Sequence, residues 1–133
     1  TINSSSACSL LKVLVSFKSN GITNSSLALV DGGATHSFIH SSLLDSKQHR
    51  VLVEKSKSKH NLVVNGVTGS VNSSCVVADG LVLIGDWSGE HSFLITNSIQ
   101  TKHQIILGRD FLKKFNAKID HGFDQMIVGD LRV

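Results

Sequence analysis

One acidic residue, Asp31, lies in a sequence context that could form a catalytic site. The apolar run 27–30 ends at Asp31, and the small residues Gly32, Gly33 and Ala34 follow it directly. An apolar run that meets glycine predicts a buried strand opening into a tight loop. A carboxylate there is costly to bury unless it is paired or neutralised, and such a group can accept and release a proton. The alternative is a hairpin turn, because Asp-Gly is a frequent turn dipeptide.

A second stretch also runs from apolar residues into a glycine. Residues 104–107 include three apolar β-formers, and Gly108, Arg109 and Asp110 come next, before a short helical pattern. We expect 104–107 to form a buried strand and Asp110 to cap the helix. The apolar face of that helix would consist of Phe111, Leu112 and Phe115.

The two stretches together resemble the retroviral-type aspartic proteases, and most closely those of gypsy-type retrotransposons. That family carries Asp-Ser/Thr-Gly-Ala after an apolar strand, and later two apolar residues, Gly, often Arg-Asp, and a short helix. Asp31, Gly33 and Ala34 match the first motif. The second motif is matched by Ile106, Leu107, Gly108, Arg109 and Asp110. The resemblance extends over about residues 10–130.

The resemblance implies an all-β fold: a small closed β-barrel of the retroviral aspartic protease type, with one or two short helices, active as a homodimer. It implies an aspartic endopeptidase that processes a retroelement Gag-Pol-type polyprotein and needs no cofactor. Asp31 would be catalytic, in an active-site loop completed by Gly32, Gly33, Ala34 and Thr35. Ile106, Leu107, Gly108, Arg109 and Asp110 would form the supporting loop. The flap over an extended peptide would contain Val64, Asn65, Gly66, Val67, Thr68 and Gly69.

Aspartic proteolysis needs two carboxylates, about 3 Å apart, that share one proton. One takes a proton from a water between them, and the other hydrogen-bonds the scissile carbonyl. The chain has one Asp-x-Gly motif followed by Ala, at Asp31. Two copies of the chain would therefore have to meet on a two-fold axis to supply the pair.

Two positions depart from the family pattern. The family has Ser or Thr directly after the aspartate, and its hydroxyl bonds across the dimer, whereas this chain has Gly32. The acid that pairs with the arginine in retroviral relatives is replaced by Thr35, so Arg109 would turn to Asp110, to a carbonyl or to the other subunit. One alternative is therefore a catalytically weak or inactive dimerisation or peptide-binding domain. Another is an unrelated small β-barrel in which Asp31-Gly32 is only a turn.

Alternation of apolar and polar residues predicts the elements around these motifs. Short strands separated by turns are typical of a β-barrel, and a short helix is expected from about Ser41. The lysine-rich segment 47–60 is expected to be a solvated strand or loop. We expect strands at 10–18, 27–30, 76–84, 92–96, 117–119 and 125–128, turns at 19–26 and 85–89, and a glycine-tipped hairpin at 61–77.

Composition limits the remaining possibilities. The 133 residues suffice for one domain, and we expect a flexible segment at 1–9 and a protease domain at 10–133. The net charge of +3 is mildly basic, and the lysines of 47–59 lack interleaved aromatics, which argues against nucleic acid. No apolar run is long enough for a membrane span.

Cysteines and histidines indicate neither disulfide nor metal. Cys8 and Cys75 are far apart and lack metal-ligand spacing, and no secretion signal begins the chain, which favours an intracellular protein with free thiols. His36 and His40 have the spacing of a helical metal pair, but no third ligand is near in sequence. We therefore expect no metal site.

Overall fold

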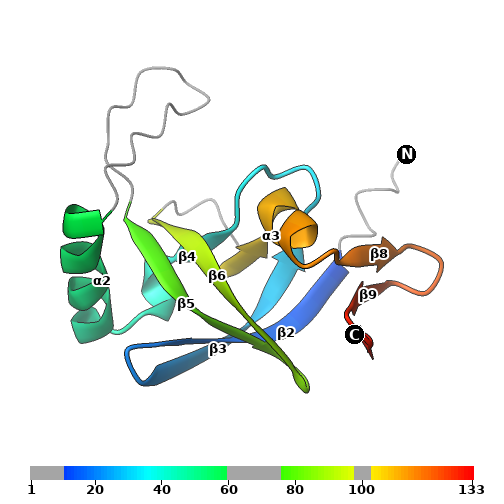
Figure 1. The fold of residues 1–133 in the computed structure, drawn as a ribbon, viewed down its shortest axis with the longest axis horizontal. Helices are drawn as coiled ribbons and strands as arrows, with labels where there is room; N and C mark the ends of the chain where they lie inside the picture. The colour runs from blue at the N-terminus through cyan, green and yellow to red at the C-terminus, as the bar shows by residue number, and fades with distance from the viewer. Residues whose placement is uncertain (1–10, 60–75, 98–102) are drawn as a thin grey trace.

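The computed structural model describes residues 11–59, 76–97 and 103–133, and its fold is mostly β (Figure 1). The strands are β2 (Leu11–Ser19), β3 (Ile22–Val30), β4 (Phe38–His40), β5 (Val77–Ile84), β6 (Trp87–Thr96), β7 (Ile105–Leu107), β8 (Lys118–Asp120), β9 (Gln125–Val128) and β10 (Leu131–Arg132). The helices are η1 (Ser41–Leu43), α2 (Ser46–Lys59) and α3 (Arg109–Lys114). Within the described ranges, no helix is long and apolar enough to cross a membrane.

Six strands close into a barrel in the order β2-β3-β7-β4-β6-β5, and β5 pairs with β2 to complete it. The neighbours are antiparallel except for β3 with β7 and β4 with β6, which are parallel. The last three strands form a separate antiparallel sheet, β10-β9-β8. The expected small closed β-barrel is thus confirmed.

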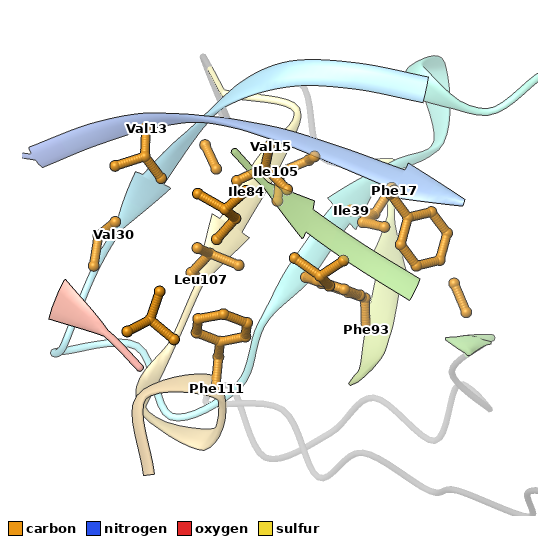
Figure 2. Close-up of a cluster of buried hydrophobic side chains, with 14 of the residues drawn as sticks. Val13, Val15, Phe17, Val30, Ile39, Ile84, Phe93, Ile105, Leu107 and Phe111 are labelled. Carbon is orange, nitrogen blue, oxygen red and sulfur yellow. The ribbon is translucent and has the colours of Figure 1, made fainter. Parts of the chain in front are cut away.

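Alternate residues of each barrel strand point inward and form the core (Figure 2). On β2, Val13, Val15 and Phe17 are almost fully buried, whereas Leu14 between them is 62% exposed. Phe17 meets Phe93 edge to face, with ring centroids 5.3 Å apart. The other inward side chains shown include Val30, Ile39, Ile84, Ile105, Leu107 and Phe111. This period of two is what a strand with one buried face dictates.

The first hairpin is longer than its sequence suggests. The expected strands at 10–18 and 27–30 are both present, but β3 begins at Ile22, so the expected turn at 19–26 shrinks to Asn20 and Gly21. Both turn residues have positive φ, 55° and 77°. Such a two-residue turn matches the twist of the paired strands, and residues 23–26 can therefore continue the ladder.

Segment 47–60 was predicted wrongly as a solvated strand or loop, because residues up to Lys59 belong to α2. Asp45 accepts a hydrogen bond from the Gln48 N–H at 2.7 Å, which satisfies a donor in the first turn. Gln48 and Leu52, one helical turn apart, are buried. Gln48 Nε2 also donates to the carbonyls of Ser19 and Ile22. The described part of α2 thus buries only a narrow stripe, and most of the segment is polar in sequence.

The other strand expectations need smaller changes. β5 and β6 form one continuous hairpin whose turn is limited to Gly85 and Asp86, so the expected turn at 85–89 is too long. The predicted short helix begins at Ser41 as the 3₁₀ helix η1, and the strands at 117–119 and 125–128 correspond to β8 and β9.

Candidate active site

Asp31 lies at the first position beyond β3, where the chain turns away from the barrel. Its backbone N–H donates to the Leu107 carbonyl at 2.9 Å, which continues the pairing of β3 with β7 by one residue. The Gly33 N–H donates to Asp31 Oδ1 at 3.0 Å, and the Ala34 N–H donates to the Asp31 carbonyl at 3.1 Å. The half-buried carboxylate is therefore held by its own turn and still reaches the surface.

The turn at Asp31 is not a hairpin. The next strand, β4, pairs with β7 and β6 and has no pairing with β3. The Asp31 loop instead carries the chain across β7, so residues 106–109 lie directly beside it. The reading of Asp31-Gly32 as a simple hairpin turn is therefore wrong.

The predicted supporting loop packs closely under the Asp31 loop. The Arg109 N–H donates to the Ala34 carbonyl at 2.7 Å. A Cβ on Gly108 would lie 2.3 Å from the His36 carbonyl oxygen, so only glycine fits there. Arg109 Nε donates to the Gly32 carbonyl at 3.3 Å, which is the carbonyl option among the three expected for this side chain.

Asp110 is placed differently from the prediction. Gly108 is the N-cap of α3 and Asp110 lies in its first turn, where its Oδ1 accepts from the Phe111 N–H at 2.7 Å. Ser37 Oγ donates to the same oxygen at 2.6 Å and accepts from the Gly108 N–H at 2.9 Å. Ser37 is fully buried. Asp110 and Ser37 thus connect the end of the Asp31 loop to the start of α3.

His91 of β6 completes this polar cluster from the other side. Its Nε2 lies 3.3 Å from Asp110 Oδ2, and its ring meets Phe93 and Phe111 edge to face. Burial lowers the pKa of His91 below its usual 6.5, and the Asp110 carboxylate opposes that shift. Sequence reasoning missed both Ser37 and His91. His91 lies two residues before Phe93 in β6, so the alternation of a strand places both side chains on the inward face.

Gly32 has room for a side chain. Its φ lies outside the left-handed region, and among the described residues an added Cβ would meet only Leu112 Cδ1, at 3.8 Å. The Gly33 position is tighter, since a Cβ there would lie 3.2 Å from Asp31 Oδ1. The local backbone conformation and packing would therefore accept a side chain with a hydroxyl group at position 32.

An apolar surface adjoins Asp31 on the outside of the barrel. Leu29, Ile106 and Phe38 are in register across β3, β7 and β4, and each alternates with inward core residues. All three are half-buried, and none packs against the main core. The arrangement can receive apolar side chains of a ligand that lies beside the carboxylate.

The remaining predicted site residues are not brought into this cluster. The six predicted flap residues, 64–69, lie outside the described residues. Thr35 Oγ1 is 3.1 Å from His36 Nδ1, and His40 Nδ1 accepts from the Ser42 N–H at the start of η1. In the part of the chain that the structure describes, no three His, Cys, Asp or Glu side chains form a group that could hold a metal ion.

Comparison with known proteins agrees with this fold. Residues 27–129 match the model of the PEG10/RTL1 protease domain family. The retroviral protease-like domain of Ddi1 from Leishmania major has a similar structure, with 17% identity, a TM-score of 0.57, and coverage of 93% of this chain and 90% of that one. EIAV protease, in complex with the inhibitor HBY-793, gives 18% identity, a TM-score of 0.50, and coverage of 84% and 92%. No curated protein matches. The chain belongs to the PEG10/RTL1 protease domain family and has the fold of the retroviral proteases.

Proposed function

We propose that this domain is an aspartic endopeptidase that works as a homodimer. The observation that carries the proposal is the Asp31 turn: a half-buried carboxylate at a strand end that accepts from the Gly33 N–H, on a residue whose backbone N–H donates to the Leu107 carbonyl. Each subunit would contribute one Asp31 to a pair that shares a proton. The water between the pair would lose a proton to one carboxylate, while the other, protonated, would hydrogen-bond the scissile carbonyl.

The proposed substrate is an extended polypeptide with apolar side chains on both sides of the cut bond. Leu29, Ile106 and Phe38 offer an apolar surface beside the carboxylate, and a half-buried apolar surface favours the same kind of side chain in a ligand. We assign residues 64–69 as the flap over this peptide. A segment of a retroelement-type polyprotein would meet these requirements.

A second candidate function follows from Gly32. A serine or threonine hydroxyl at this position could bond to the partner loop, and glycine cannot. The two carboxylates would then be held less firmly, and a small misplacement can lower a catalytic rate strongly. The alternative is a domain that dimerises and binds peptide but cleaves weakly or not at all.

The test uses the domain with its natural flanking sequence and two matched substitutions. Asp31→Asn removes the proposed base, and Asp124→Asn removes the same charge from an exposed turn. We expect wild type and Asp124→Asn to cut the flanking sequence with a bell-shaped pH profile and an optimum on the acid side of neutrality. Asp31→Asn should be folded and inactive.

Other results would separate the alternatives. A wild-type dimer that binds peptide without cutting it would favour the inactive domain. Cleavage by a clean Asp31→Asn preparation would refute Asp31 as the catalyst. A rate that keeps rising above neutral pH would point to a thiol, histidine or metal mechanism instead.

A further inference from the structure

A cavity lies at the end of the barrel where two tight turns approach each other. Its volume is about 360 Å³, and it is lined by Asp86, Trp87, Asp130 and Leu131. Asp86 belongs to the β5–β6 turn and Asp130 to the β9–β10 turn, both at the lower right of Figure 1. None of these four residues belongs to the Asp31 loop or to its supporting loop, so the cavity is a separate feature.

The backbone around the cavity is fixed by two glycines in the left-handed region. Gly85 has φ +56° and Gly129 has φ +58°, values that side chains rarely adopt. A Cβ on Gly129 would lie 3.5 Å from Trp87 Cδ1, and a Cβ on Gly85 would lie 3.6 Å from the methyl carbons of Leu131. A Cβ would thus fit at either position, and it is the backbone conformation that favours glycine in both turns.

The Trp87 ring of this cavity packs against two other aromatic rings. The Trp87 ring meets Phe115 edge to face at 4.8 Å and Phe111 at 5.8 Å, both on or next to α3. Trp87 also pairs with Ile84 across the hairpin. The half-buried indole thus has little freedom to collapse into the cavity, and a ligand would meet a surface that is already in place.

The chemistry of the lining selects a cation. The faces of tryptophan attract ammonium and guanidinium groups more than those of any other side chain. The two exposed carboxylates, Asp86 and Asp130, add negative charge at the rim of a chain whose net charge is +3. Leu131 gives an apolar contact for the methylene stem of a long basic side chain.

We infer that this cavity binds a lysine or arginine side chain of a peptide segment, as a docking site separate from Asp31. The volume is within the range of pockets that hold small ligands. A metal ion fits less well, because no group of three His, Cys, Asp or Glu ligands exists among the residues that the structure describes. The docking site would hold a basic segment of a substrate or partner.

The chain contains one tryptophan, so its fluorescence reports directly on this cavity. We would titrate the wild-type protein with tetralysine amide, with tetraarginine amide and with tetraglutamate as the opposite charge. We expect a saturable change in emission with the two basic peptides and none with tetraglutamate. The change should weaken at about 1 M salt, where the screening length is only ~3 Å.

Substitutions assign the effect to the cavity. Asp86→Asn and Asp130→Asn should each weaken binding of the basic peptides by about 1.4- to 5-fold, the range for an exposed ion pair, and the double variant should weaken it further. Asp124→Asn removes the same charge at the other end of β9 and should bind like wild type. Asp31→Asn should also bind the basic peptides like wild type, because the cavity does not include the proposed catalytic residue.

Three results would overturn the inference. The first is emission that does not change with either basic peptide while the indole N–H resonance of isotope-labelled protein also stays fixed. The second is an equal loss of binding in Asp86→Asn, Asp130→Asn and Asp124→Asn, which would indicate unspecific attraction. The third is the same saturable change with calcium alone and none with the peptides. The resonance measurement uses wild type, so it holds even where a variant is poorly folded.

Discussion

Replacing Ser37 by alanine should destabilise the domain more than its small size suggests. The hydroxyl is fully buried and makes two hydrogen bonds, to Asp110 Oδ1 at 2.6 Å and from the Gly108 N–H at 2.9 Å. A hydrogen bond to a charged group contributes about 1.5–3 kcal/mol, and a buried N–H left without a partner costs about 1–3 kcal/mol. The Asp110 side chain is 30% exposed, so water can replace part of the first loss. We therefore expect Ser37→Ala to lower the free energy of unfolding by about 2–4 kcal/mol.

The matched control is Ser25→Ala. The Ser25 hydroxyl also bonds another side chain, Ser16 Oγ at 2.7 Å, but on the exposed face of the β2–β3 hairpin. Its loss should cost no more than about 0.5 kcal/mol, as is usual for an exposed position. Urea unfolding at neutral pH gives both values, provided that wild type and variants share the same denaturant slope. A Ser37→Ala variant within about 1 kcal/mol of Ser25→Ala would refute the role given to this hydroxyl.

Three further predictions concern the same region. Gly32→Ser should tighten the proposed dimer by about 5- to 150-fold, the value of two new bonds of about 0.5–1.5 kcal/mol each, and unchanged sedimentation would show that residue 32 does not face a partner. Gly108→Ala should cost about 3 kcal/mol or more in urea unfolding because its Cβ would meet a backbone carbonyl at 2.3 Å, whereas Gly32→Ala, with its nearest contact at 3.8 Å, should be nearly neutral. The pKa of His91 is lower in the folded chain than in the unfolded chain, so the unfolded chain binds a proton at this residue more readily. The stability that neutral His91 contributes is therefore complete above about pH 6.5 and is lost as the pH falls from that value towards the folded pKa. His91→Gln should therefore make unfolding less sensitive to pH between about 7.5 and 5.5, and an unchanged pH dependence would contradict the assignment.

The Asp31 loop and its support could be read from the sequence because their signals are local. An apolar run followed by glycine predicts a strand that ends in a tight turn. This pattern occurs at Asp31-Gly32-Gly33 and again at Gly108. The contact of Gly108 with the His36 carbonyl leaves no space for a side chain, so the glycine in the sequence indicates this close packing. Local signals predicted each turn separately, and it was the resemblance to the retroviral-type proteases that implied that the two loops lie together.

The parts that the sequence did not reveal depend on tertiary contacts. Among residues 46–55 of α2, whose side chains the structure describes, Gln48 and Leu52 are the buried ones. Gln48 Nε2 donates to the carbonyls of Ser19 and Ile22, which flank the β2–β3 turn. The local sequence, rich in valine and lysine, favours a strand or a solvated segment just as well. Ser37 and His91 give no motif either, because each becomes a partner of Asp110 only when β4, β6 and α3 meet.

The parallel pairing of β3 with β7 also fixes when the Asp31 turn can be joined to the rest of the barrel during synthesis. Leu107 lies 76 residues after Asp31 (107 minus 31), yet its carbonyl accepts the Asp31 N–H. A ribosome that adds about 5–20 residues per second needs roughly 4–15 s to make that stretch. Until then the β3 edge at residues 28–30 has no partner, and an unpaired apolar edge invites association with other chains. A nascent chain therefore has this edge exposed for seconds, until the pairing with β7 covers the edge and anchors the Asp31 turn.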